Sequence, residues 1–577
     1  MNSEKLTNFG AKLATTTALV SLAFAYGART ARAGVCTAGG GGVYNCSGAA
    51  NPGTDVAQYF SGASNAVTLT TSPGFGIDPT INSPGQSAIW VQNGKYGISI
   101  TDNNASVITG ASNSRGIFAN NTGSGATGDV TVTTNGDVSG GTGIQALNNA
   151  VGGNVTVTAN NAYGTTSGSG IINEARAGGM STTTVNGTVE GRTAVRTSSD
   201  GGDTSITVNG SVNGLGNYGV GVRADVNNGG DQTITVASGA SVTGNTTGID
   251  TVANGGTATI TVSGTVTAGN GASFGPSAAG IHTDRFTPGG VSNIILNSGA
   301  NVSAGSGVAI SNGTYSSNYG TVNVDTTANV TVNAGATVTG AVNLGDGTDS
   351  FTFNGGSAAA ITTIDGGNGT DALTFTNGSV NISGSQVTNF ETVTIGSGGN
   401  VSFNGSVTSD VTVENGGTLS AGNSPGLMSI IGNLDLDASS TTLFEIAGLT
   451  PGVEIGGHDV IDVSAGTATL AAGAAIDIDF FAGFVAGLGD TFDVLVADDI
   501  IGDLNTLNFD FTGALLGSGF AWSSELFTYA GGANVGRETL RLTVVADAGA
   551  VPEPSSMFLL GAGMFGLWRF RRRRKAA

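Results

Sequence analysis

Few residues in this chain have side chains suited to catalysis. The 577 residues include two histidines, His282 and His458, and two cysteines, Cys36 and Cys46. The histidines are far apart in sequence, and we expect each at the surface or at a strand edge. No serine sits in a G-x-S-x-G motif with a plausible base, and nucleophilic catalysis needs such a partner. The sequence therefore predicts a protein that is not an enzyme.

A basic cluster keeps one enzymatic alternative open. The clustered basic residues of the body are Arg176, Arg192, Arg196 and Arg223, and few acids accompany them. Polysaccharide lyases and glycosidases built on β-helices use arginine, lysine and paired carboxylates on one face of the coil. Paired carboxylates in a groove would favour this alternative, a β-helix that binds or cleaves polysaccharide.

Two Asp-Gly turns are the most site-like feature of the sequence. "IDGGNGTDALTF", from Ile364, fits the calcium-binding pattern G-G-x-G-x-D-x-U-x, and "NLGDGTDSFTF", from Asn343, fits it in part. Asp349 and Asp371 are 22 residues apart, about one coil, and carboxylate and carbonyl oxygens from two stacked turns suit calcium. The preferred interpretation is a pair of plain turns without a cofactor, with calcium at the two aspartates as the alternative.

A degenerate repeat supplies the elements that would position these residues. "DVTVTTNGDVSGGTGIQALNNAVGG", from Asp129, and "TSITVNGSVNGLGNYGVGVRADVNNGG", from Thr204, share a T-I-T-V-like strand, a turn and two further short strands. The units are about 22 to 34 residues long, and such periods indicate a solenoid. In "VTVTT", Val130 and Val132 point to one side and the threonines to the other, so stacked units share an apolar core.

The fold class expected from this repeat is all-β. Residues 61–415 are predicted to form a right-handed parallel β-helix, preceded by an N-terminal cap at residues 34–60. Residues 416–546 are predicted to form a smaller C-terminal β-domain, in which longer alternating strands indicate antiparallel or jelly-roll-like pairing. Tandem β-sandwiches are the alternative fold, but they have longer strands, more aromatic residues and a period of about 90–100 residues.

Threonine pairs in the repeat suggest a second alternative function. Segments such as "TITV" and "TVT" are similar to the flat Thr-x-Thr arrays of ice-binding solenoids, which order water. Such arrays need regular rungs with matched spacing, which a degenerate repeat does not predict. An outward threonine face is also what any solvated β-helix shows. A flat face of regular Thr-x-Thr rungs would favour ice binding.

The N-terminal segment predicts export. Lys5 and Lys12 precede the apolar stretch "LATTTALVSLAFAYGA", and "ARA" at 31–33 predicts cleavage before Gly34. Residues 1–33 are therefore expected to be a signal peptide for the Sec export machinery, with a retained membrane helix as the alternative. In an exported chain Cys36 and Cys46 predict a disulfide. Closing a loop of this length stabilises a fold by roughly 2–3 kcal/mol.

The charge distribution argues against nucleic-acid partners. The net charge is −21, with 40 acidic residues against 19 basic ones. A nucleic-acid-binding face needs clustered lysine and arginine, which the long acidic body lacks. The acidic balance fits solubility outside the cell.

The last segment, residues 547–577, combines a triplet, an apolar run and a basic block. Met557 to Trp568 are apolar or small and span about 18 Å as a helix, against a hydrocarbon core of about 30 Å. This predicts a short transmembrane helix. A stop-transfer tail follows, which the positive-inside rule keeps cytoplasmic. Its basic residues are Arg569, Arg571, Arg572, Arg573, Arg574 and Lys575.

The order of these three parts resembles the PEP-CTERM sorting signal of Gram-negative bacteria, with Pro552, Glu553 and Pro554 as the sorting triplet. The resemblance implies recognition by an exosortase, a membrane cysteine transpeptidase, with processing near the triplet. It implies transient anchoring in the inner membrane and a final place at the cell surface or outside the cell. It also implies an association with exopolysaccharide and biofilm formation.

The body is similar to autotransporter passenger domains. "GGTLSAGNSPG", from Gly416, resembles the G-T-L-x-P-G-x-S-P-G turn that ends many passenger β-helices, with Ala421 in place of the first proline. "GDTFDVLVAD", from Gly489, resembles the segment that follows it. Together the resemblances imply an exported, non-catalytic surface or matrix protein, structural or adhesin-like. Its expected partners are the exosortase, the Sec machinery, and exopolysaccharide or other surface proteins.

Overall fold

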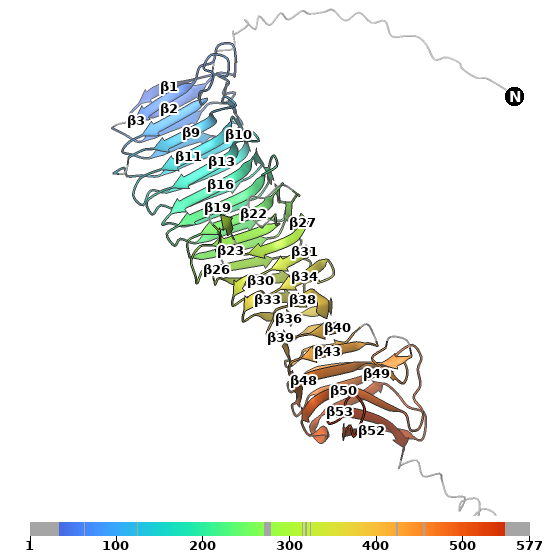
Figure 1. The fold of residues 1–577 in the computed structure, drawn as a ribbon. Helices are drawn as coiled ribbons and strands as arrows, with labels where there is room; N and C mark the ends of the chain where they lie inside the picture. Colours follow the sequence, from blue (N-terminus) through green and yellow to red (C-terminus); the bar gives the residue numbers. More distant parts are fainter. Residues whose placement is uncertain are drawn as a thin grey trace, which may run out of the picture.

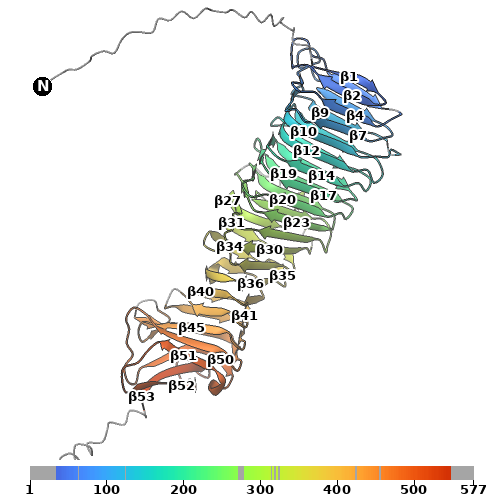
Figure 2. The same cartoon turned by 180° about the vertical axis from the view of Figure 1, so that it is seen from behind.

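Short strands stacked along one axis make a long rod (Figures 1 and 2). The computed structural model describes residues 34–547 except 63, 124, 271–277, 314, 318–319, 323–324, 423–424 and 454–455. In that part of the chain, the regular elements are strands apart from two 3-10 helices, Gly384–Gln386 and Leu504–Thr506. The all-β solenoid is therefore confirmed.

The predicted membrane-associated segments cannot be located on this rod. The signal peptide, the sorting triplet, the apolar helix and the basic tail all lie outside the described residues. Within the residues that are described, no helix combines the length and apolarity needed to cross a membrane.

Each turn of the rod consists of three strands, and each strand pairs in parallel with its counterpart one coil away. The first column of strands, called the threonine face, continues along most of the rod (Figure 2). Its members are β4 (Val67–Thr71), β7 (Ile98–Asp102), β10 (Val130–Ser139), β12 (Val155–Tyr163), β14 (Ser181–Val185), β17 (Thr204–Val208), β20 (Gln232–Val236), β23 (Thr257–Val262), β26 (Val291–Leu296), β30 (Thr327–Asn333), β33 (Ser350–Asn354), β36 (Ala372–Thr376), β39 (Thr392–Ile395), β41 (Asp410–Val413) and β44 (Leu434–Leu436).

The second column of strands, called the mixed face, carries most of the aromatic and charged side chains discussed below. It consists of β3 (Gln58–Gly62), β6 (Ile89–Asn93), β9 (Arg115–Asn121), β11 (Thr142–Asn148), β13 (Ser169–Ala175), β16 (Thr193–Asp200), β19 (Val220–Asn227), β22 (Thr247–Ala253), β25 (Ile281–Arg285), the end of β27 (Asn301–Asn312), the end of β31 (Thr337–Asn343), β34 (Ile361–Asp365) and β38 (Val387–Thr388).

The third column of strands closes each coil and is called the third face. It includes the ends of β10 and β12 and the beginnings of β27 and β31. Its separate strands are β5 (Gly76–Ile77), β8 (Val107–Thr109), β15 (Thr188–Gly191), β18 (Ser211–Gly214), β21 (Ser241–Gly244) and β24 (Thr265–Ala268). Further along the rod the same role falls to β37 (Gly378–Ser383), β40 (Gly399–Val407) and β42 (Thr418–Ala421).

The core fills the space between the three faces. Val130 and Val132 are fully buried, as the alternation in "VTVTT" predicts, while Thr131 and Thr133 are partly exposed; the last threonine, Thr134, is buried. Towards the C-terminal half the aliphatic residues give way to phenylalanines. Phe353 and Phe375, on adjacent coils, stack with ring centroids 5.2 Å apart and are buried. Stacking of like residues lets each coil bury the apolar side of its neighbour.

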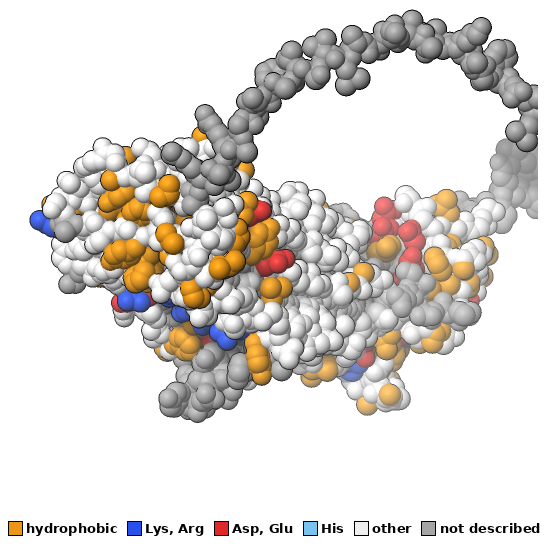
Figure 3. All heavy atoms as spheres, turned by 90° about the horizontal axis from the view of Figure 1, so that it is seen from above, with side chains coloured by type: hydrophobic (Ala, Val, Ile, Leu, Met, Phe, Trp, Pro, Cys, Tyr) orange, Lys and Arg blue, Asp and Glu red, His pale blue; other side chains and the backbone are white. Residues whose placement is uncertain are grey.

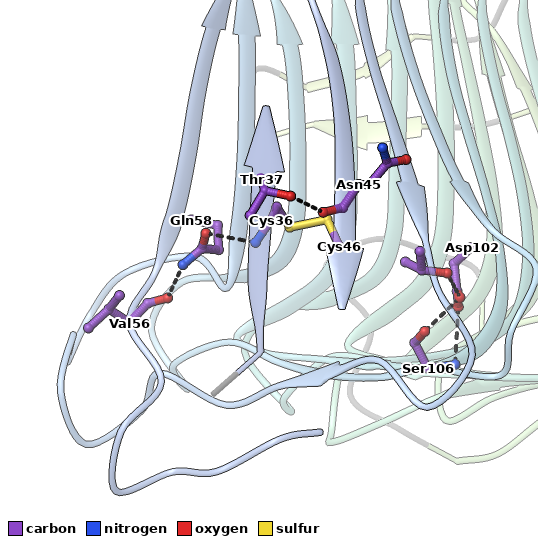
Figure 4. The surroundings of a disulfide bond; sticks show 9 residues. Cys36, Thr37, Asn45, Cys46, Val56, Gln58, Asp102 and Ser106 are labelled. Carbon is purple, nitrogen blue, oxygen red and sulfur yellow. Dashed lines mark hydrogen bonds between the residues drawn. A yellow bond between two sulfur atoms is a disulfide. The ribbon is translucent and has the colours of Figure 1, made fainter. Parts of the chain in front are cut away.

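An antiparallel hairpin caps the N-terminal end. β1 (Val35–Gly40) pairs with β2 (Val43–Ser47), and a disulfide joins Cys36 to Cys46, the pair indicated by their spacing (Figure 4). The Cys36 N–H donates to Gln58 Oε1, so the cap is also bonded to the first strand of the mixed face. β2 then starts the parallel stack by pairing with β4.

The expected antiparallel pairing after residue 415 is wrong for most of the strands up to residue 513 and is found at the end of the segment. Parallel pairing joins β43 (Leu427–Ile431) to β48 (Val460–Leu470) and β48 to β50 (Thr491–Ile501). It likewise joins β45 (Thr441–Ile446) to β49 (Ala475–Phe480) and β49 to β51 (Asn508–Gly513). Antiparallel pairs that close the rod follow, between β50 and β53 (Glu538–Ala546) and between β52 (Phe520–Thr528) and β53. Alternation identifies the buried side of a strand but not its direction relative to its neighbour.

The phenylalanine stack gives a stability prediction. Phe353→Ala should lower the free energy of unfolding by about 3–5 kcal/mol, because it leaves a cavity between two coils. Leu515→Ala, at a side chain that is 75% exposed, is the control and should change it little. Urea denaturation followed by circular dichroism measures both. Equal losses in the two variants would contradict the assigned core.

Candidate functional site

The threonine face is the most regular surface of the rod. From β4 to β23, each strand presents an outward hydroxyl residue, one buried residue and an outward threonine. Register places these side chains in two columns. The first column is Thr68, Ser99, Thr131, Thr156, Thr182, Ser205, Thr233 and Thr259, and the second is Thr70, Thr101, Thr133, Thr158, Thr184, Thr207, Thr235 and Thr261.

This grid is regular although the repeat is degenerate. Neighbouring strands lie about 4.8 Å apart, and residues two positions apart along a strand lie about 6.7 Å apart. The varying lengths of the repeat units are taken up in the turns, so the strands keep their register. The array ends at β26, where Asn293 and Ile295 occupy the two columns. A face of regular rungs, six of them Thr-x-Thr and two Ser-x-Thr, is therefore present.

The mixed face brings together charged residues from four successive strands. Arg196 of β16, Arg223 of β19, Asp250 of β22 and His282 of β25 occupy equivalent positions in the register. Asp225, two residues after Arg223, accepts from Arg223 Nε and from Arg196 Nε, each at 2.8 Å. The result is a ladder of ion pairs along the rod axis.

The ladder continues to a buried carboxylate. Arg223 Nη1 donates to Asp250 Oδ2 at 2.9 Å, and His282 Nδ1 lies 3.1 Å from Asp250 Oδ1. Burial alone would raise the pKa of Asp250, but the hydrogen bond to His282 and the positive charge of Arg223 outweigh it and lower that pKa. Burial raises the pKa of the nearby Asp284 to about 6.

The arrangement is that of a charge ladder rather than of a general acid and base. Both oxygens of Asp225 and both of Asp250 are engaged by arginine or histidine. A glycosidase needs two carboxyl groups that face one open site between them. The described ladder leaves neither of these two carboxylates free for that role.

Both histidines lie elsewhere than expected. His282 is inside β25 rather than in a loop and is 7% exposed, and His458, on the short β47 (Gly457–His458), is 2% exposed. Burial lowers the pKa of His458, whose ring packs edge-on against Phe492 at 5.3 Å. Asp225 and Asp250 were not predicted as partners of the arginines, although their positions in the repeat indicate it. Asp250 and His282 each follow a Gly-Ile pair, at the position that Arg223 fills after Gly-Val in "GVGVRADV".

The two Asp-Gly turns stack on adjacent coils. β32 (Asp346–Gly347) pairs in parallel with β35 (Asn368–Gly369). Both glycines have positive φ, and a Cβ on Gly369 would lie 1.7 Å from the carbonyl oxygen of Gly347, so no other residue fits there. The Ala328 N–H donates to Asp349 Oδ1 at 2.6 Å, and the Asp349 N–H donates to Asp371 Oδ1 at 2.8 Å.

These aspartates work as links between coils. The same pattern continues where the Asp371 N–H donates to Glu391 Oε2 at 2.6 Å. The second oxygens, Asp349 Oδ2 and Asp371 Oδ2, are buried without a hydrogen-bond partner. Burial raises the pKa of Asp349 to about 7, and burial also raises the pKa of Asp371. Within the described residues, His, Cys, Asp and Glu form no group of three or more suited to a metal. Calcium at this site stays a prediction.

A comparison with protein-family models identifies a known motif near the C-terminus. Residues 550–574 match the family model of the PEP-CTERM protein-sorting motif. The chain carries a PEP-CTERM motif. The match covers the Pro552-Glu553-Pro554 triplet, the apolar run and most of the basic tail, and it confirms the resemblance derived from them. The PEP-CTERM motif implies an exported protein that an exosortase sorts, with transient anchoring in the membrane before processing. No curated protein matches the chain.

The buried carboxyl of Asp349 gives a pH prediction. Its folded pKa, about 7, lies above the ordinary value of 3.8, so the folded chain holds a proton that the unfolded chain has lost. The stability that this carboxyl contributes to the fold is therefore fully present below about pH 4. It decreases as the pH rises to about 7. In Asp349→Asn this part of the pH dependence should disappear, because an amide does not ionise, while its oxygen still accepts from Ala328.

The measurement is the urea midpoint as a function of pH between 4 and 8. Asp435→Asn, at an exposed position on β44, is the matched control. An equal change of pH dependence in both variants would contradict the buried-carboxyl origin.

Proposed function

We propose that this chain is a non-catalytic structural protein, adhesin-like in kind, that presents a stiff rod at the cell surface or in the extracellular matrix. The observation that carries the proposal is the parallel pairing that continues along the described chain from β3 to β51. Each coil adds about 4.8 Å of length and contacts only its neighbours. Such a fold produces an elongated molecule with a long, repetitive surface.

The chemistry of the rod surface supports a role without catalysis. The carboxylates of the mixed-face ladder are engaged in ion pairs, and those of the Asp-Gly turns link coils through backbone N–H groups. A low density of charge, with 10% of the residues charged, suits a rod that works in contact with other polymers. The sorting motif supports a place at the envelope, where exopolysaccharide and other surface proteins are the proposed neighbours.

The sorting step is tested by replacing Pro552, Glu553 and Pro554 with alanines. If an exosortase reads this triplet, the variant should accumulate at full length in the inner membrane, while the wild-type chain is processed and leaves it. Cell fractionation with intact-mass spectrometry measures both the location and the C-terminus. Ser555→Ala with Ser556→Ala is the control, since it changes the adjacent pair of residues and should be processed normally. Unchanged processing and release of the triplet variant would defeat the sorting hypothesis.

Ice binding is a second candidate function, and the threonine face is the specific observation that favours it. A grid of threonine hydroxyl and methyl groups, repeated coil after coil, is the kind of surface with which ice-binding solenoids order water. The threonine face and the mixed face lie on different sides of the rod (Figures 1 and 2).

Two central substitutions test the ice-binding candidate. Thr158→Lys combined with Thr207→Lys places two long charged side chains in the middle of the grid. If the threonine face binds ice, this variant should lose inhibition of ice recrystallisation and thermal hysteresis. Thr243→Lys, at an exposed position on the third face, is the control and should keep both. Absence of either activity in the wild-type chain, or equal activity in all three proteins, would rule this function out.

A further inference from the structure

Three aromatic side chains form a column on the mixed face near the N-terminal end. Register aligns Tyr59 of β3 with Trp90 of β6 and Trp90 with Phe118 of β9. The ring centroids of Tyr59 and Trp90 lie 5.1 Å apart, and those of Trp90 and Phe118 lie 5.6 Å apart. Tyr59 is 56% exposed, so the column opens to solvent at one end. Trp90 is partly exposed and Phe118, at the other end, is buried, so Tyr59 and Trp90 form the outward part of the column.

A hollow lies beside the column. Its volume is about 230 Å³, and it is lined by Ala57, Gln58, Tyr59, Gln86, Ser87 and Trp90. A second hollow of about 600 Å³ begins at Pro84 and Gly85, directly before Gln86, and its wall includes Ser112, Asn113 and Thr165. Among the described residues that line the two hollows, none carries a charge. Figure 3, which looks down on this end of the rod, shows apolar patches among mostly uncharged side chains.

Polar groups around the aromatic column are fixed in place. The Tyr59 hydroxyl donates to Gln92 Oε1 at 3.3 Å, which orients the exposed ring. Arg115 packs its guanidinium over the Phe118 ring, 4.6 Å from the centroid, and donates from Nε to Gln145 Oε1. Trp90 Nε1 is a buried donor without a hydrogen-bond partner. A buried indole N–H ordinarily finds an acceptor, and this one has no partner among the described residues.

We propose that the aromatic column and the two hollows bind a neutral polysaccharide, with the glycan chain lying along the rod axis across successive coils. A pyranose ring has apolar C–H faces and a rim of hydroxyls. The exposed Tyr59 ring, set at 77° to the partly exposed Trp90 ring, supplies an apolar surface for a C–H face, while glutamine, serine and asparagine side chains supply donors and acceptors for the hydroxyls. Convergent polar groups beside an apolar wall are the usual composition of a specific ligand site.

The chemistry of the lining selects this occupant over others. An acidic polymer would need basic groups in the hollows, and Arg115 is already engaged by Gln145 and Phe118. An apolar peptide or a hydrophobic partner would be poorly matched by a wall rich in amides and hydroxyls, which would lose their hydrogen bonds to water. A neutral sugar chain keeps the hydrogen bonds and covers the exposed rings.

This site goes beyond the proposed structural role, because it assigns a ligand class to one stretch of the rod. It does not depend on sorting, since binding by the purified chain is measured whether or not the PEP-CTERM motif is processed. It also predicts binding without cleavage.

The experiment titrates the purified exported chain with a panel of hexasaccharides in a calorimeter. The neutral probes are β-1,4-linked glucose and galactose hexasaccharides, and the acidic probe is a hexamer of galacturonic acid. The expected result is binding of a neutral probe, with the dissociation constant raised about tenfold or more in Trp90→Ala, because truncation of a central tryptophan removes much of the contact energy. Phe481→Ala, at another exposed aromatic residue directly after β49 and close to the other end of the rod, is the matched control and should bind as wild type does.

Trp90→Phe and Tyr59→Ala keep the test decisive if Trp90→Ala fails to fold. Trp90→Phe should retain most of the affinity because it keeps a ring, and Tyr59→Ala should lose affinity because it removes the exposed end of the column. Recovery of the hexasaccharide unchanged in mass is expected. The proposal is overturned if no neutral probe binds, if Trp90 and Tyr59 variants bind as wild type does, or if only the acidic probe binds.

Discussion

Hydrogen bonds between successive coils run along the length of this molecule, and each strand of the rod is held by the strand one coil before it and the strand one coil after it. Because this pairing is parallel and in register, a residue sits directly above its equivalent in the neighbouring coil. An inward position is therefore apolar in most coils, as Val132, Val157 and Ile206 are, although Thr183, between the last two in register, is buried and polar. A polar residue that enters the interior needs internal partners, as Thr183 finds in Asn173 and Thr197.

The same constraint leaves the outward positions free to differ between faces. On the threonine face they repeat one chemistry, whereas on the mixed face they change from aromatic rings at Tyr59 and Trp90 to ion pairs at Arg223 and Asp250. Neighbours within a column act on one another, so a single substitution changes the surroundings of the residues above and below. The charge ladder illustrates this, since Asp250 keeps a lowered pKa only because His282 and Arg223 flank it.

Much of the fold could be predicted because two patterns are visible in the sequence. Apolar and polar side chains alternate along each strand, and the repeat unit has about the length of one coil. The inward Val130 and Val132, and the stacked turns at Asp349 and Asp371, follow from spacing alone. The parallel course of β43 to β51 could not be predicted, since alternation is the same in parallel and antiparallel strands. The burial of His282 was missed because a variable-length insertion precedes it and hides its position in the repeat. The aromatic column was missed because Tyr59, Trp90 and Phe118 lie in units too divergent to align by eye.

The direction of the inter-coil hydrogen bonds has a mechanical consequence. A pull along the rod acts along these bonds, so all the bonds between two coils share the load and must fail together. The carboxylates of Asp349, Asp371 and Glu391 each accept an N–H from the preceding coil and add further bonds in the same direction. The Cys36–Cys46 bridge lies within the cap and carries none of this load between coils. Resistance to stretching is therefore spread along the whole column rather than concentrated at one covalent link.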